Sequence, residues 1–177
     1  MDGTNQGLMS KRALTKYLSE LKKKELESQL IDLYTRFPIV KEYYDFVFNP
    51  KEDKLVQDAK VKISNEYFPQ RRKRAKARRS VAQKFIKHFI TLGVDPHFTA
   101  DLMLYNLEIA QTYSINKNIP TTFYKSMEKS FNELVRYISL NGLLSQFKDR
   151  IVACYRFTTE NDWPYQEDFS KSLDILD

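Results

Sequence analysis

The feature of the sequence best suited to chemistry is a short run of basic side chains. Seven lysines and arginines lie between positions 71 and 79 with no acid among them: Arg71, Arg72, Lys73, Arg74, Lys76, Arg78 and Arg79. The net charge is +6, yet the rest of the chain holds 22 basic against 23 acidic residues. Arginine forks match phosphate and carboxylate geometry. The run therefore predicts an exposed basic segment over residues 69–80 that binds an anion, nucleic acid first and an acidic protein second.

The conformation of the basic run depends on the helix that follows it. An apolar stripe with helical spacing begins at Ala82. A helix continued backwards would place Arg71, Arg74 and Arg78 on that same stripe. Because an unpaired buried charge is costly, two arrangements stay open. Either the helix begins near Arg79 and leaves the other basic residues in a loop, or it projects beyond the core. Both expose the charge.

The neighbours of the basic run suggest what it binds. Tyr67 and Phe68 are close enough in sequence to stack on unpaired bases, as aromatic residues do in proteins that bind single strands. No helix-turn-helix, zinc-finger or RNA-recognition motif is readable in the chain. The alternative is a solvated basic linker, or one neutralised by acidic side chains of the same chain such as Glu25, Glu27, Glu52 and Asp53.

A second set of residues has the spacing of a metal or acid–base site. His97, Asp101, Tyr105 and Glu108 lie four, four and three residues apart and share one face of a predicted helix. An imidazole and two carboxylates, from His97, Asp101 and Glu108, are candidates for a divalent metal or for proton transfer. The plainer interpretation is an ordinary i, i+4 pair on a solvated face. We expect no cofactor and no catalytic residue.

Composition excludes several classes of protein. The 177 residues include 4 glycines and 6 prolines, too few for turn-rich sandwiches, barrels or Gly-rich phosphate loops, whereas 42% hydrophobic residues allow a sizeable core. No apolar run is as long as a membrane span, and residues 1–10 lack the apolar stretch of a signal peptide. The single cysteine, Cys154, lies on an apolar stripe that suits the core of a cytoplasmic protein. We expect no membrane partner, and the oligomeric state stays open.

Periodicity predicts the elements that must position these residues. Apolar residues recur every three or four positions along almost the whole chain, and no stretch alternates as a strand does. We expect an all-α fold of about seven to nine helices. Residues 1–9 are expected to form an N-terminal extension, and residues 10–177 a single helical domain.

The predicted junctions between helices recur at a fixed spacing. Asn49, Asp95 and Asn141 are 46 residues apart, a period typical of HEAT and armadillo hairpins. Asn49, Pro50 and Glu52 have the types and spacing of an N-cap, a first helical residue and a capping-box acid. Two architectures stay open, an irregular helical bundle and a short stack of HEAT/armadillo-like hairpins.

Three blocks of the sequence carry a resemblance to a known family. They are LTKYLSELKKKELESQLIDLYTRFPIVKEYYDFVFNP, KISNEYFP and ARRSVAQKFIKHFITLGVDP. With these blocks the chain resembles a bacterial family known as a domain of unknown function, over about residues 11–163. The resemblance implies a small, all-helical intracellular bacterial protein, and it implies no activity.

Three hypotheses about function follow. The first is a non-enzymatic binding module that uses residues 71–79 for an anionic partner, with nucleic acid as the first candidate. The alternative is a protein–protein interaction scaffold built of helical hairpins. The third is a metal-dependent enzyme that uses His97, Asp101 and Glu108.

Overall fold

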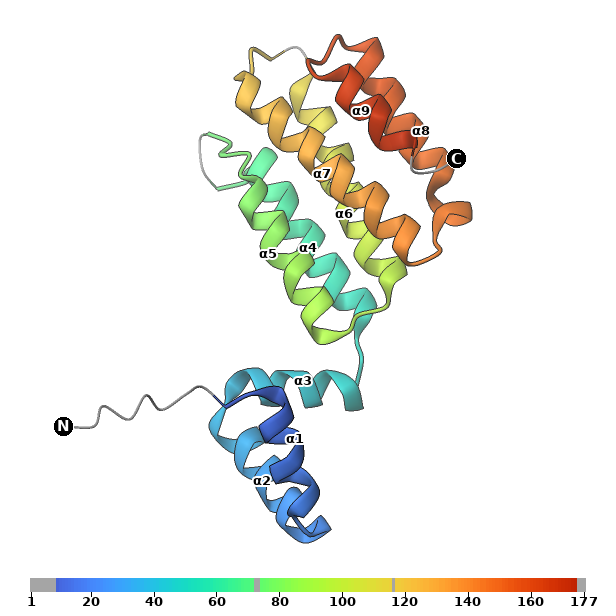
Figure 1. Cartoon of the computed structure of the whole chain (residues 1–177). Coiled ribbons are helices and arrows are strands. Elements are labelled where there is room, and N and C mark those ends of the chain that lie inside the picture. Colours follow the sequence, from blue (N-terminus) through green and yellow to red (C-terminus); the bar gives the residue numbers. More distant parts are fainter. Residues whose placement is uncertain (1–8, 72–73, 116, 175–177) are drawn as a thin grey trace, which may run out of the picture. The chain divides into compact units, whose positions relative to one another are not determined.

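The structure is a computed structural model that describes residues 9–71, 74–115 and 117–174 (Figure 1). These residues form nine α-helices and no strand. The expected all-α fold with seven to nine helices is therefore confirmed. None of these helices is both long enough and apolar enough to cross a bilayer.

Contacts within the chain divide it into two compact units, Met1–Pro50 and Lys51–Asp177. We call them unit 1 and unit 2, and each is described by itself. Most of the expected N-terminal extension, residues 1–8, lies outside the described residues. The single domain expected over residues 10–177 stays a prediction, because two compact units can still belong to one folding domain.

Unit 1 contains three helices: α1 (Lys11–Glu20), α2 (Lys23–Arg36) and α3 (Pro38–Phe48). The Ser10 hydroxyl accepts a hydrogen bond from the Ala13 N–H and so caps α1. Pro38 starts α3 with a backbone φ already suited to a helix. The Tyr34 hydroxyl donates to Asp45 at 2.8 Å and joins α2 to α3. None of residues 9–50 is buried, so this part of unit 1 has no closed core.

Unit 2 contains six helices among its described residues: α4 (Glu52–Tyr67), α5 (Arg79–Leu92), α6 (Pro96–Ser114), α7 (Thr121–Leu140), α8 (Leu144–Glu160) and α9 (Gln166–Leu173). They form three hairpins in chain order, and the middle hairpin, α6 with α7, packs against both of the others (Figure 1). The hairpins begin at Glu52, Pro96 and Leu144, close to the 46-residue spacing seen in the sequence. The described part of unit 2 is thus a stack of hairpins, one of the two architectures that the sequence left open.

Helix α6 is the centre of unit 2, because it contacts α4, α5, α7 and α8. Leu102, Leu104, Leu107 and Ala110, which point in different directions around α6, are all buried. The opposite face, with Asp101, Tyr105 and Glu108, is only half-buried, so α6 is covered over more than half of its circumference. The core therefore runs along the middle hairpin, and the loops at the hairpin ends are left at the surface.

Local chemistry sets the helix ends of unit 2. Gly93 ends α5 with a φ of 77°, a left-handed conformation in which glycine meets no steric penalty. The Asp95 carboxylate accepts the N–H of His97 at 2.8 Å and caps α6. The capping box predicted at Asn49 and Glu52 is wrong, since Asn49 ends α3 and α4 begins only at Glu52. The Glu52 carboxylate instead accepts the Asp95 N–H at 2.8 Å and joins the first hairpin to the second.

Candidate nucleic-acid interface

Two loops of unit 2 lie at the same end of the hairpin stack. One connects α4 to α5 and carries the basic run, and the other follows α6 and carries Lys117 (Figure 1). Arg74 of the first loop and Lys117 of the second line the same hollow. Helix α5 begins at Arg79. Of the two arrangements that the sequence left open, the one in which the helix begins near Arg79 is therefore confirmed, and the described basic residues before it, Arg71, Arg74, Lys76 and Arg78, lie in the loop.

Glu66, in the last turn of α4, forms hydrogen bonds with the part of the basic run that directly precedes α5. Its carbonyl oxygen accepts the backbone N–H groups of Lys76 and Ala77, each at 3.0 Å. Its buried carboxylate accepts two hydrogen bonds from the Arg78 guanidinium, from Nε at 2.8 Å and from Nη2 at 3.0 Å. The hydrogen bonds to Glu66 raise the pKa of Arg78 above its ordinary value. Backbone and side chain of one residue thus fix how the loop enters α5.

Arg79, the first residue of α5, is bound to α7. Its Nε donates to the Ser130 hydroxyl at 2.8 Å, and its Nη2 donates to the Glu133 carboxylate. Two of the predicted anion-binding residues, Arg78 and Arg79, therefore have acidic partners within unit 2. Those partners are Glu66 and Glu133, not the four acids suggested by the sequence, because the long-range packing of α4, α5 and α7 decides which carboxylates come close.

The other described members of the basic run face solvent. Arg71, Arg74 and Lys76 are exposed, and among the residues that the structure describes no carboxylate forms an ion pair with them. Arg72 and Lys73, which the sequence also predicts to bind an anion, lie outside the described residues. The described basic run is therefore split: Arg78 and Arg79 are paired with carboxylates, whereas Arg71, Arg74 and Lys76 are exposed without such a partner.

Lys117 adds an exposed cation from the second loop. Its Nζ lies 3.7 Å from the centroid of the Tyr113 ring and 5.4 Å from that of Phe68, a favourable cation–π arrangement. Lys117 and Tyr113 were not predicted from the sequence, because a single lysine and a single tyrosine on another hairpin carry no signal of their own. Four cations of the two loops are exposed and form no ion pair among the described residues, and we call them the cationic surface: Arg71, Arg74, Lys76 and Lys117.

The two aromatic residues before the basic run have different environments. Phe68 is 41% exposed and meets the Tyr113 ring edge to face, with 6.0 Å between centroids. Tyr67 is only 2% exposed, and its hydroxyl donates to the Asn106 Oδ1 at 3.3 Å. Burial, the main cause, raises the pKa of Tyr67. The stacking role expected of Tyr67 is therefore wrong, because its ring lies in the core, whereas the Phe68 side chain is partly exposed.

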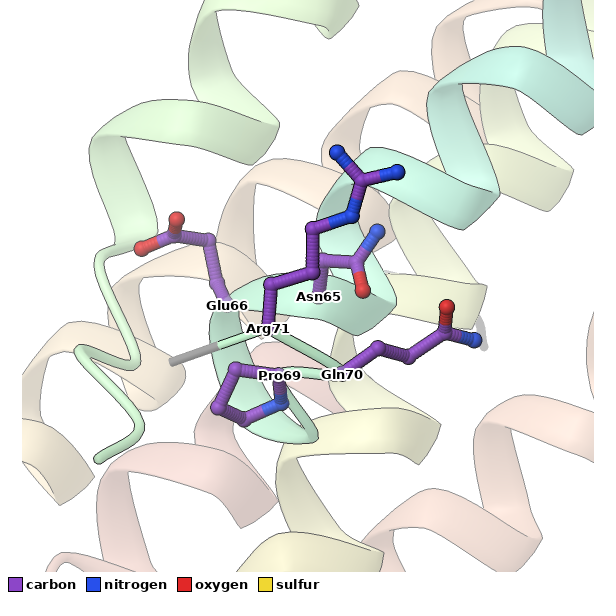
Figure 2. A pocket seen from close by; sticks show the side chains of 5 residues that line it. All are labelled: Asn65, Glu66, Pro69, Gln70 and Arg71. Atoms are coloured by element: carbon purple, nitrogen blue, oxygen red, sulfur yellow. The ribbon is translucent and has the colours of Figure 1, made fainter. Parts of the chain in front are cut away.

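Hollows lie on both sides of the basic loop. One, of ≈ 450 Å³, is lined by residues of α4 and the start of the loop. Figure 2 shows it with the Arg71 guanidinium pointing away from the Glu66 carboxylate. The other, of ≈ 620 Å³, lies between the two loops and includes Phe68, Arg74, Tyr113 and Lys117 in its lining. We call this second one the aromatic hollow.

The candidate metal set of the sequence belongs to an ion-pair network. Asp101 accepts hydrogen bonds from Lys60 of α4 at 2.6 Å and from Arg150 of α8 at 2.8 Å. Glu108 accepts two more from the Arg150 guanidinium, at 3.0 and 2.8 Å. Burial acts to raise the pKa of Asp101, but the hydrogen bonds and charges of the two cations together outweigh it, and the pKa lies below its ordinary value. The carboxylates predicted for a metal are thus bound to side-chain cations.

His97 and Cys154 lie in surroundings typical of residues with a structural role. The His97 Nδ1 lies 2.8 Å from the Gln146 Oε1, and its ring packs on Phe147 at 5.1 Å between centroids. Within the described ranges, no three His, Cys, Asp or Glu residues are grouped so as to hold a metal ion. Cys154 lies in the core, as the sequence predicts, and burial raises the pKa of its thiol to about 12. A thiol that stays protonated at neutral pH is a poor nucleophile.

Comparison with known proteins tests the family resemblance seen in the sequence. No curated protein and no solved structure shows significant similarity to the chain. A family model does match, and it confirms the expected domain of unknown function, whereas the bacterial origin stays a prediction. The matching model is described as a family of unknown function, DUF6155, and it covers residues 9–177, so the chain belongs to that family.

Proposed function

We propose that the protein is a non-enzymatic module that binds nucleic acid through the cationic surface. The observation that carries this proposal is the exposure of cations from two loops, of which Arg74 and Lys117 line the same hollow as the exposed ring of Phe68. Surface cations bind phosphates by releasing condensed counterions, and an exposed ring stacks on bases. An acidic protein would use the same cations, but the aromatic ring beside them favours nucleic acid.

The pairing of the arginines indicates how strong the salt dependence should be. Arg78 and Arg79 already bind carboxylates of unit 2, so among the described cations of the two loops we expect phosphate contacts from the four residues of the cationic surface. Each contact to a duplex contributes about −0.9 to the slope of log affinity against log salt, and four contacts give roughly −4. A slope of this size distinguishes phosphate binding from an interaction through apolar contacts.

The experiment is a titration of fluorescently labelled oligonucleotides, followed by anisotropy at several salt concentrations. The test variant replaces Arg71, Arg74, Lys76 and Lys117 together by glutamine. We expect the wild-type protein to bind with a slope near −4 on duplex, and the test variant to lose binding, because its phosphate contacts are removed.

A matched control removes the same amount of charge elsewhere in unit 2. Four exposed lysines outside the two loops, Lys54, Lys84, Lys87 and Lys129, are replaced by glutamine. This variant should bind like the wild-type protein if the position of the charge matters and the total charge does not. The proposal is wrong if wild-type protein fails to bind any nucleic acid at about 50 mM salt, or if both variants lose affinity equally.

A cytoplasmic, bacterial protein is part of the same proposal. It is supported by the single cysteine, which is buried as a thiol and suits a reducing compartment, and by the resemblance stated above. Finding the gene in a bacterial genome tests the origin, and measuring the protein in cytoplasmic and periplasmic fractions of that bacterium tests the location.

Protein–protein interaction is the second candidate function, and the surface of unit 1 favours it. None of residues 9–50 is buried, and a hollow of ≈ 270 Å³ between α2 and α3 is lined mainly by apolar and aromatic residues, among them Leu30, Tyr44 and Phe48. Phe48 is 83% exposed. A segment this short rarely folds without burying its apolar face on something. A second copy of the chain carries an equal face, so a two-fold pair would cover both at once.

Sedimentation of the full chain tests this second candidate. We expect a dimer for the wild-type protein and a shift toward monomer for Phe48→Glu, which places a charge in the apolar contact. Val61→Glu is the control, since Val61 is 59% exposed but lies on α4 in unit 2. A wild-type chain that sediments as a monomer at tens of micromolar concentration would contradict the pairing.

A further inference from the structure

We propose that the aromatic hollow is a subsite for one unpaired base of a single-stranded nucleic acid. This inference rests on the nucleic-acid binding proposed above and adds the form of the ligand. The base would stack on Phe68, and the phosphates on either side of it would bind Arg74 and Lys117, which belong to the two loops that border the hollow.

The ring that would receive the base is partly exposed and also packs on other rings. Phe68 contacts Tyr113 edge to face, and Tyr113 in turn packs on Tyr67 at 5.6 Å and on Phe123 at 6.2 Å between centroids. Tyr67 and Phe123 are buried. Because the chain of rings is anchored in the core, Phe68 and Tyr113 lose little conformational freedom when a ligand binds.

The cations of the hollow lie where a phosphate would need them. The Lys117 ammonium lies above the Tyr113 ring, within 5.4 Å of the centroid of Phe68. Arg74 lines the same hollow from the other loop, and within the described part of the chain neither cation forms an ion pair with a carboxylate. An anion at this place would therefore find two donors that no acidic side chain occupies.

The shape of the hollow favours a single strand over a duplex. Its volume of ≈ 620 Å³ is ample for one nucleobase with its sugar. In a duplex each base is paired and stacked on both faces, so no face is available to Phe68. The described end of the hairpin stack presents loops and no projecting helix that would enter a major groove. Stacking on one ring also requires no particular base, which predicts weak sequence preference.

The test compares a labelled single strand of mixed sequence with a labelled duplex, using the full chain and three variants. Phe68→Ala removes the stacking ring, and we expect it to weaken binding of the single strand by about tenfold or more, with the salt slope unchanged. Phe68→Trp retains a ring and should keep single-strand affinity close to wild type. Ile90→Ala is the control, because Ile90 is 52% exposed at the far end of α5 and should change neither affinity.

A second comparison separates stacking from charge. Lys117→Gln should lower the magnitude of the single-strand salt slope by about 0.7, the contribution of one phosphate contact, whereas Phe68→Ala should leave it unchanged. Equal loss of duplex and single-strand affinity in Phe68→Ala would overturn the base subsite, because a merely structural role of the ring affects both ligands alike.

The outcomes distinguish the subsite from the function on which it rests. If Phe68→Ala keeps full single-strand affinity while the quadruple glutamine variant loses all binding, the base subsite is wrong and nucleic-acid binding stands. If the wild-type protein binds neither single strand nor duplex, both are wrong. If polyglutamate competes as well as a single strand of equal charge, the cations bind an acidic protein and both are again wrong. Selective loss of single-strand binding in Phe68→Ala, with retention in Phe68→Trp, supports the subsite.

Discussion

The contribution of a buried polar side chain to stability depends on whether it has a hydrogen-bond partner, as two polar groups in the core of unit 2 show. The Thr99 hydroxyl and the Asn106 amide nitrogen are buried and have no hydrogen-bond partner among the described residues. Thr158 is equally buried, but its hydroxyl donates to the Tyr155 carbonyl at 2.7 Å. Burying a polar group without a partner costs free energy, whereas a paired group costs little. The hydroxyl of Thr99 therefore lowers the stability of the core, whereas the hydroxyl of Thr158 contributes to it.

Replacing Thr99 by valine should raise the free energy of unfolding by about 1 kcal/mol, because it removes a hydroxyl without a partner and keeps the shape of the side chain. Thr158→Val is the matched control and should lower the free energy by about as much, because it removes a hydrogen bond. Urea unfolding followed by circular dichroism measures both changes. A loss of stability in Thr99→Val equal to that in Thr158→Val would contradict the assignment.

At the scale of elements, side-chain ion pairs join the three hairpins of the stack. Lys60 of α4, Asp101 of α6 and Arg150 of α8 form one network across all three hairpins. Arg79 adds a link from α5 to Glu133 of α7. These contacts connect helices far apart in sequence, and they join the three hairpins to one another. The two loops that carry the cationic surface are positioned by this packing.

Asp101→Asn should destabilise the protein at neutral pH and less so in acid. The folded-state pKa of Asp101 lies below its ordinary value of 3.8. The carboxylate therefore contributes stability above that pH, and this stability is lost as the pH falls through the folded-state pKa. We expect a loss of about 1–3 kcal/mol at pH 7 and a smaller loss at about pH 3.

Urea unfolding of wild type and variant at both pH values measures this difference. Asp58→Asn is the control, because Asp58 is exposed on α4 and forms no ion pair among the described residues. Its effect should be small at either pH. The network contributes nothing measurable if Asp101→Asn and Asp58→Asn behave alike at pH 7.

At the scale of the whole molecule, the apolar core and the excess charge are unevenly distributed. All buried residues of the described chain belong to unit 2, and residues 9–50 contain none. The basic run and the aromatic hollow also belong to unit 2. Stability and the proposed binding should therefore both reside in unit 2, while the exposed apolar surface of unit 1 is the part that needs a partner.

A chain that begins at Lys51 should fold on its own. It keeps every buried side chain of the described structure, so we expect cooperative urea unfolding and an unchanged near-ultraviolet circular dichroism signal of Trp163, which is buried in unit 2. A peptide of residues 9–50 should show little helix alone, because nothing in it is buried. Loss of cooperative unfolding in the shortened chain would show instead that the whole chain is one folding domain, as the sequence suggested.

Much of the fold can be predicted from the sequence, because it depends on neighbours along the chain. Apolar spacing of three and four residues predicts helices, Asp95 before a proline predicts the start of α6, and the 46-residue spacing predicts hairpins of equal length. The loop conformation of the basic run is one of two that the sequence allowed. Its charge is set by composition alone.

Only the tertiary structure decides which cations are available and what surrounds them. Glu66 binds Arg78 and Glu133 binds Arg79. Lys117 belongs to another hairpin and is the fourth residue of the cationic surface. The physical reason is that helices form through hydrogen bonds between residues four apart in the chain, so local sequence predicts them. An ion pair or a ring contact between hairpins instead requires side chains from distant helices to meet. Such meetings depend on how the hairpins pack.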